Sequence, residues 1–323
     1  MPFYISSYFL LLQNNVINKL RYWGFSRFFG DLTYIYARKR RRQMNLYLRR
    51  IKFAGDAAAK AVGTPPVIIL HGLYCSGANW YPTAKLIAGQ IPAEVYTLDL
   101  PNHGRSEWCD RFSYSSVAED VRGWLADHSG DFPGGVVLLG HSIGGRAAMV
   151  AAARDRIVKG LAMADISPFT EPRRDKIITI VHSMLLHRMA EAKQKGVPDA
   201  EIDDYLRREG VDLSAIGSLR LSYRQMNLAL VADKAMDLLP DWAGLHANED
   251  YSRLKNLPAL FIRGGEDSPY IPRFAVDQLD TRFDNYTVVT MEGTTHNLYQ
   301  EKPGEFADIF AGWYSANFSD KSS

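Results

Sequence analysis

The sequence has little cysteine and no long apolar run. The first shortage argues against a small disulfide-rich domain, and the second argues against a membrane-spanning helix. The two cysteines, Cys75 and Cys109, cannot build the disulfide framework of a small secreted domain, and their spacing matches no metal site. We expect free thiols in a reducing compartment. No apolar run reaches the roughly 18 residues of a membrane-spanning helix. The apolar opening MPFYISSYFLLLQ lacks the preceding charge and the cleavage site of a secretory signal.

Acidic residues are scarce at the start of the chain. Residues 1–52 contain eleven Lys and Arg but one acid, Asp31, so they carry a charge of +10 and the remainder carries −8. Basic and aromatic residues in an extension over 1–43 favour peripheral contact with an anionic membrane. A solvated extension and a presequence in a eukaryote are alternatives. A nucleic-acid contact is the least favoured alternative, and we expect no nucleic-acid partner. The expected location is cytoplasmic, at the membrane surface, or mitochondrial if the source is eukaryotic.

The body of the chain alternates short apolar runs with helical periodicity, which is typical of βαβ units. The predicted strands are 45–53, 65–72, 94–100, 134–142, 161–168, 256–267 and 286–296. Residues 168–252 have helical spacing throughout. The pattern predicts an α/β fold with a mostly parallel central sheet flanked by helices. Residues 44–167 and 253–323 form its core, and 168–252 are inserted as a helical cap.

The stretch LLGHSIGGRAAM, residues 138–149, places Ser142 between a predicted strand and a predicted helix. Gly140 and Gly144 flank the serine, and small neighbours are what a tight strand-to-helix turn requires. Such a turn lifts the hydroxyl above the sheet at a helix N-terminus. Ser142 is therefore the predicted nucleophile.

A serine nucleophile needs a base, an acid and donors for the oxyanion. His296, after the last predicted strand, is the predicted base, and Asp267, after the preceding strand, is the predicted acid. The chain order Ser, Asp, His is that of an α/β-hydrolase. The backbone N–H groups of Leu73 and Ile143 are the predicted oxyanion donors.

With these residues identified, the chain resembles the α/β-hydrolase superfamily, and within it the YbfF/ABHD-eleven group of serine esterases. The matching motifs span residues 45–315 and read LHGLYCSGANW, LDLPNHGRSEW, GHSIGG, ADISP and RGGEDSPYI. The resemblance implies a capped serine esterase without metal or organic cofactor, and it carries over Ser142, His296, Leu73 and Ile143. In some relatives the acid is the aspartate of the DISP motif, which is Asp165 here. We favour Asp267 and keep Asp165 as the alternative.

The expected reaction is hydrolysis of small-molecule carboxylic esters or thioesters with short to medium acyl chains, through an acyl-enzyme. A carbon–carbon bond hydrolase or a cofactor-free perhydrolase with the same triad is the alternative, and a non-enzymatic scaffold is a third. Arg146 is expected to be solvated or to contact the cap, with a substrate carboxylate as an alternative partner. The candidate substrate contacts are Tyr74, His141, Tyr223 and Asn297.

Overall fold

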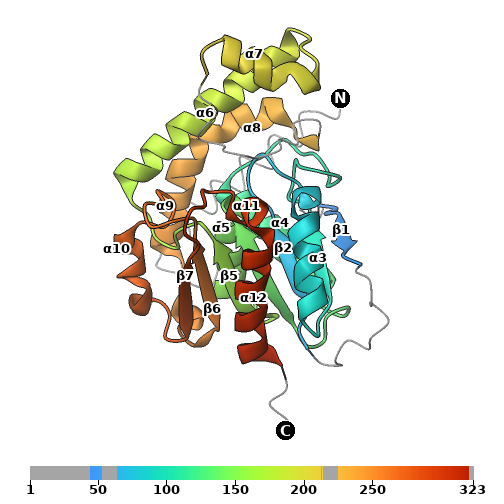
Figure 1. Ribbon diagram of the computed structural model, residues 1–323, viewed down its shortest axis with the longest axis vertical. Helices are drawn as coiled ribbons and strands as arrows, with labels where there is room; N and C mark the ends of the chain where they lie inside the picture. Colours follow the sequence, from blue (N-terminus) through green and yellow to red (C-terminus); the bar gives the residue numbers. More distant parts are fainter. Residues whose placement is uncertain (1–43, 53–63, 212, 214–224, 320–323) are drawn as a thin grey trace, which may run out of the picture. The chain divides into compact units, whose positions relative to one another are not determined.

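The computed structural model describes residues 44–52, 64–211, 213 and 225–319, which fold around a seven-stranded sheet (Figure 1). The strand order is β1-β3-β2-β4-β5-β6-β7. β1 pairs antiparallel with β3, and every other pairing in this sheet is parallel. The strands are β1 Leu48–Arg50, β2 Val67–Leu70, β3 Val95–Leu98, β4 Val136–His141, β5 Val158–Ala164, β6 Ala259–Arg263 and β7 Tyr286–Thr290. The predicted α/β fold with a mostly parallel sheet is confirmed.

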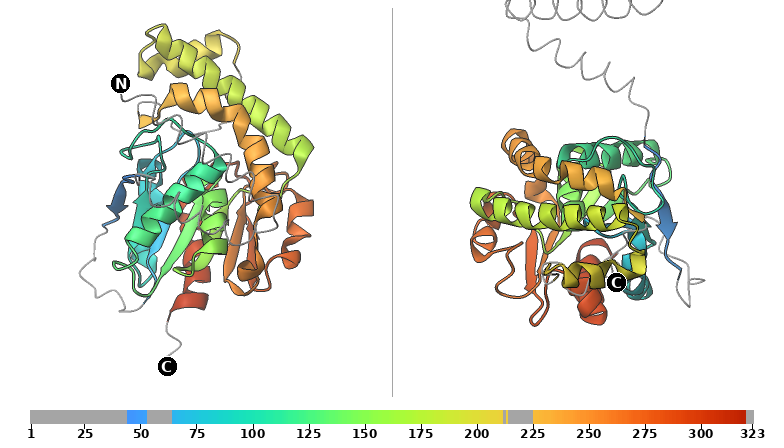
Figure 2. Two further views of the ribbon diagram at one scale, coloured as in Figure 1. Left: turned by 180° about the vertical axis from the view of Figure 1, so that it is seen from behind. Right: turned by 90° about the horizontal axis from the view of Figure 1, so that it is seen from above.

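Helices cover both faces of the sheet because successive side chains of each strand point to opposite sides. In β2, Ile68 and Leu70 join one apolar cluster, whereas Val67 and Ile69 join the other. The first cluster includes residues of α4 Tyr114–Asp127 and α5 Ile143–Arg154, and the second includes residues of α3 Tyr81–Gln90 and α12 Pro303–Phe318 (Figures 1 and 2). Strands buried on both faces become continuous apolar runs, which is why the sequence reveals them.

Between β5 and β6 the described residues are mainly helical, and they lie over the carboxyl ends of the strands (Figures 1 and 2). The longest helix there, α6, starts at Pro172 because the Glu171 side chain accepts the backbone N–H groups of Arg173 and Arg174. These helices fall within the segment for which the sequence predicts a cap. They are α6 Pro172–Gln194, α7 Ile202–Arg208, α8 Leu228–Lys234 and α9 Leu238–Asn248.

Apolar residues of α6 lie on the side that packs into the core and also on a second side that is exposed. Leu185 and Met189 are buried in the core. Ile177, Val181 and Met184 follow the same helical spacing, yet they are 64%, 41% and 66% exposed. The apolar stripe of α6 therefore continues onto a surface that the described part of the chain does not cover.

The sequence makes two predictions about membranes, namely a peripheral contact through residues 1–43 and no membrane-spanning helix. The extension over residues 1–43 lies outside the described residues. Among the helices that are described, none is both long enough and apolar enough to cross a bilayer.

The tight packing of the β4–α5 turn against β2 leads to a prediction about the free energy of unfolding. A Cβ atom on Gly144 would lie 2.4 Å from the carbonyl oxygen of Leu70 and 2.5 Å from that of His71. Because these atoms are backbone, Gly144→Ala should lower the free energy of unfolding by about 1–3 kcal/mol, measured by urea denaturation. Gly312→Ala is the matched control, since a Cβ there meets nothing within 4 Å. That substitution lies in a helix and should raise stability by about 0.5–1 kcal/mol. Equal effects at the two sites would contradict the packing argument.

Candidate active site

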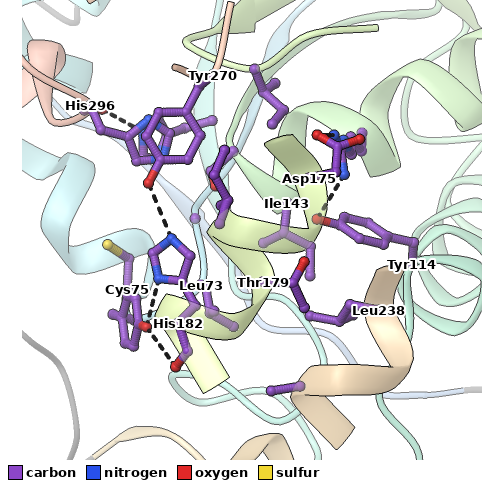
Figure 3. A pocket seen from close by; sticks show the side chains of 18 of the residues that line it. Leu73, Cys75, Tyr114, Ile143, Asp175, Thr179, His182, Leu238, Tyr270 and His296 are labelled. Carbon is purple, nitrogen blue, oxygen red and sulfur yellow. Dashed lines mark hydrogen bonds and ion pairs between the residues drawn. The ribbon is translucent and has the colours of Figure 1, made fainter. Parts of the chain in front are cut away.

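Ser142 occupies the sharpest point of the turn between β4 and α5. Its backbone φ of 53° and ψ of −123° are values that residues other than glycine rarely adopt. The turn is crowded, since a Cβ on Gly140 would lie 2.4 Å from the carbonyl oxygen of Gly144. Ser142 lines a cavity together with His296, as Figure 3 shows for the histidine. This is the strained strand-to-helix geometry of a serine nucleophile.

His296, in the loop after β7, is held by a carboxylate from the loop after β5. Its Nδ1 lies 2.8 Å from Oδ2 of Asp165, the residue that follows β5. Asp165 is completely buried, and its Oδ1 accepts the backbone N–H of Gly264 at 2.9 Å and the hydroxyl of Ser268 at 2.7 Å. Three donors therefore converge on this carboxylate, which accepts through both of its oxygens. Because a carboxylate accepts, Nδ1 of His296 donates this hydrogen bond, and Nε2 is the nitrogen left for the predicted role as base.

Asp267, the favoured acid in the sequence analysis, is not the carboxylate bonded to His296. The chain turns at Gly265, whose φ is +83°, and Glu266 and Asp267 then point to solvent. Ser268, the next residue, is the one that points inward to Asp165. The prediction of Asp267 as the partner of His296 is wrong for this geometry, and Asp165, the alternative, takes that position.

The predicted oxyanion donors lie on both sides of Ser142. Ile143 is the first residue of α5, so its N–H has no acceptor within that helix. The loop after β2 runs against the serine, because a Cβ on Gly72 would lie 3.3 Å from Cβ of Ser142. Leu73, the following residue, lines the same cavity as Ile143 (Figure 3). Leu73 and Ile143 therefore lie on the cavity that Ser142 lines, and their role as oxyanion donors stays a prediction.

The candidate substrate contacts have different surroundings. Tyr74, His141 and Asn297 line the cavity, whereas Tyr223 lies outside the described residues. His141 is buried, which lowers its pKa well below the usual value. As a neutral ring it donates from Nε2 to the carbonyl oxygen of His296 at 2.8 Å. His141 therefore braces the loop that carries His296.

A chain of aromatic side chains joins this loop to α6, and sequence reasoning missed it. Tyr270 stacks on the ring of His296, with centroids 3.5 Å apart. His182 of α6 places Nε2 3.1 Å from the Tyr270 hydroxyl and Nδ1 2.8 Å from the Tyr74 hydroxyl (Figure 3). Burial, with His296 nearby, lowers the pKa of His182 to about 4. The neutral ring therefore donates one of these bonds and accepts the other.

The cavity holds a second nucleophile candidate and no evident metal site. Cys75 lines the cavity, but burial raises the pKa of its thiol to about 12, so it stays protonated. In the part of the chain that the structure describes, no group of three or more His, Cys, Asp or Glu side chains could hold a metal ion. Ser142 is the side chain with the geometry of a nucleophile.

Replacing each of the two candidate acids by asparagine tests which of them orients His296. Asp165→Asn keeps the shape of the side chain but removes the charge that orients His296, so we expect kcat to fall by about 10³- to 10⁴-fold. Asp267→Asn is the matched control and should leave kcat within about twofold of wild type, since this carboxylate is exposed and is not the one bonded to His296. The measurement is steady-state hydrolysis of a 4-nitrophenyl ester. Greater damage from the Asp267 substitution would reject Asp165 as the acid.

Several known proteins and one family model are similar to this chain. A mouse protein named sn-1-specific diacylglycerol lipase ABHD11 is 27% identical over 280 residues, which cover 82% of this chain and 86% of the mouse protein. A Wickerhamomyces anomalus protein named probable alcohol acetyltransferase is 31% identical over 276 residues, covering 77% of this chain and 78% of that protein. A solved structure described as a marine microorganism esterase superposes with a TM-score of 0.61 at 27% identity, covering 84% of this chain and 100% of that one. The model of the alpha/beta hydrolase family matches residues 67–309. The chain belongs to the alpha/beta hydrolase family.

Proposed function

We propose that this carboxylic ester hydrolase works through a covalent acyl-enzyme on Ser142, with His296 as the base and Asp165 as the acid. The observation that carries the proposal is the placement of Ser142 and His296 on one cavity, with the Nδ1 of the histidine bonded to a buried carboxylate. A histidine held in this way presents the correct tautomer to a serine hydroxyl.

The chemistry follows from these positions. Oγ of Ser142 attacks the ester carbonyl carbon while Nε2 of His296 takes its proton, and the N–H groups of Leu73 and Ile143 stabilise the oxyanion. His296 then gives the proton to the departing alkoxide, which leaves as the alcohol. Water, deprotonated by the same nitrogen, releases the acid and regenerates Ser142. Positioned acid–base catalysis contributes about 10²- to 10⁴-fold, and one oxyanion donor about 10²- to 10³-fold.

The walls of the cavity favour short to medium acyl chains in esters or thioesters. Apolar side chains near the serine line it, namely Ile143, Ile166, Ile178 and Leu238. The names of the mouse and yeast relatives refer to diacylglycerol hydrolysis and to acetyl transfer to an alcohol, so the acyl-enzyme can be resolved by water or by an alcohol. We infer a small-molecule carboxylic ester as the substrate.

A p-nitrophenyl ester series, from acetyl to palmitoyl, tests the proposal. Wild type should turn over the shorter chains, and Ser142→Ala should lose at least about 10³-fold in kcat because the nucleophile is absent. Running the assay with and without ethanol, and measuring ethyl ester by chromatography, separates hydrolysis from transfer. Labelling of Ser142 by a fluorophosphonate without turnover of any ester would reject ester cleavage and favour the carbon–carbon hydrolase or perhydrolase. Absence of labelling would favour a non-enzymatic scaffold.

We also propose that this protein associates peripherally with a membrane. This association is motivated by the charge of +10 over residues 1–52 and by the exposed apolar stripe of α6. The location would then be the cytoplasmic membrane surface, or a mitochondrial membrane in a eukaryote. The full chain should cosediment with vesicles that contain phosphatidylserine, and removal of residues 1–43 should weaken this binding. Equal sedimentation of the two chains would exclude the extension as the membrane contact.

A further inference from the structure

Helix α6 reaches the cavity that holds Ser142 with polar side chains at two levels. Near its start, Oδ1 of Asp175 lies 3.5 Å from Nη2 of Arg146 in α5. Arg146 is 5% exposed, so the expectation of a solvated charge is wrong and the expected contact with the helical segment is found. About two turns further along α6, the ring of His182 lines the same cavity. This second contact joins two parts of the proposed machinery.

The first partner of His182 packs on the proposed base. Nε2 of His182 lies 3.1 Å from the hydroxyl oxygen of Tyr270, and the Tyr270 ring stacks on the ring of His296 (Figure 3). The centroids of the two stacked rings are 3.5 Å apart, and their planes differ by 15°. The hydrogen bond from Nδ1 of His296 to Asp165 does not by itself prevent the ring from turning about that bond. The stack limits this rotation, so it fixes the direction in which Nε2 of His296 points.

The second partner of His182 belongs to the loop after β2. Nδ1 of His182 lies 2.8 Å from the hydroxyl oxygen of Tyr74. Tyr74 directly follows Leu73, whose backbone N–H is one of the predicted oxyanion donors. The Tyr74 side chain is buried, and burial raises the pKa of its hydroxyl well above the usual value, so the hydroxyl stays neutral. Its bond to His182 therefore ties the loop after β2 to α6.

One neutral imidazole can satisfy both hydroxyls. It donates from one ring nitrogen and accepts at the other. Burial, with His296 nearby, lowers the pKa of His182 to about 4, so the ring is neutral near pH 7. His182 then receives a hydrogen bond from one tyrosine and gives one to the other. The separation of the Tyr74 and Tyr270 hydroxyls is therefore set by the span of a single rigid ring.

We propose that His182 is a positioning residue, which holds the base and the oxyanion loop at their working separation through Tyr270 and Tyr74. The inference rests on the ester hydrolysis proposed above. His182 exchanges no proton with the substrate and acts only through the two tyrosines. Helix α6 is then part of the machinery as well as a cover over the strand ends.

The test removes these hydrogen bonds in the full chain, with 4-nitrophenyl acetate as the substrate. Tyr270→Phe and Tyr74→Phe keep the rings and each lose one bond, whereas His182→Leu loses both. We expect kcat to fall by about 3- to 10-fold in each phenylalanine variant and by about 10- to 100-fold in His182→Leu, with KM within about threefold of wild type. His187→Leu is the matched control, because His187 of α6 bonds to the Ser183 carbonyl of its own helix and does not line the cavity. Its kcat should equal that of wild type.

A double variant separates positioning from a merely structural role. Adding Tyr270→Phe to His182→Leu should cause no further loss of kcat, because the bond between these two residues is already absent. Multiplication of the two single effects would overturn the inference. A rise in KM at unchanged kcat would also overturn it, since His182 would then be a substrate contact. If His182→Leu fails to fold, the two phenylalanine variants decide the outcome, and wild-type kcat in both would reject the inference.

A second measurement does not depend on turnover, so it separates this inference from the proposed function. The proton on Nδ1 of His296, bonded to Asp165, exchanges with water at a rate that NMR can follow. Exchange should be at least about fivefold faster in Tyr270→Phe and in His182→Leu than in wild type, because the His296 ring is held less firmly. Equal exchange rates would reject the positioning role. Faster exchange in a chain that cleaves no ester would support the positioning and reject the proposed function alone.

Discussion

The parallel pairing of β4, β5 and β6 is the constraint on which the site depends. In this register His141 lies opposite Ala164, and Ala164 lies opposite Ile262. The next residues along β4 and β5 are Ser142 and Asp165, so both emerge at the same edge of the sheet. The chain beyond β6 supplies the Gly264 N–H and the Ser268 hydroxyl that hold the carboxylate. His296 needs only to reach this edge from the loop after β7 to complete the arrangement.

The parts that could be predicted from the sequence are those with local causes. Continuous apolar runs reveal the strands because both faces of the sheet are buried, and Gly140 and Gly144 mark the turn at Ser142. The identity of the acid could not be predicted in this way, because two aspartates follow neighbouring strands. The choice depends on the direction of the turn at Gly265, which sends Asp267 outward and Ser268 inward.

The helical segment was harder still to interpret. Its spacing predicts helices, but the same spacing describes Leu185, which is buried, and Met184, which is exposed. Nothing local in the sequence reveals that His182 joins two tyrosines from distant loops, or that Asp175 pairs with an arginine beside the nucleophile. These contacts arise only when α6 lies across the strand ends, and they give the cavity its polar wall.

The backbone conformations of Ser142 and Asp165 have a consequence for the evolution of this protein. Asn102, Ser142 and Asp165 are the described non-glycine residues with positive φ, so two of the three belong to the proposed triad. Each such conformation costs on the order of 1–3 kcal/mol, held in place by the surrounding structure. Glycine at either position would relax the backbone and abolish the chemistry. A lineage released from selection for turnover would therefore drift toward a more stable and inert protein, and the strain is retained only while catalysis is required.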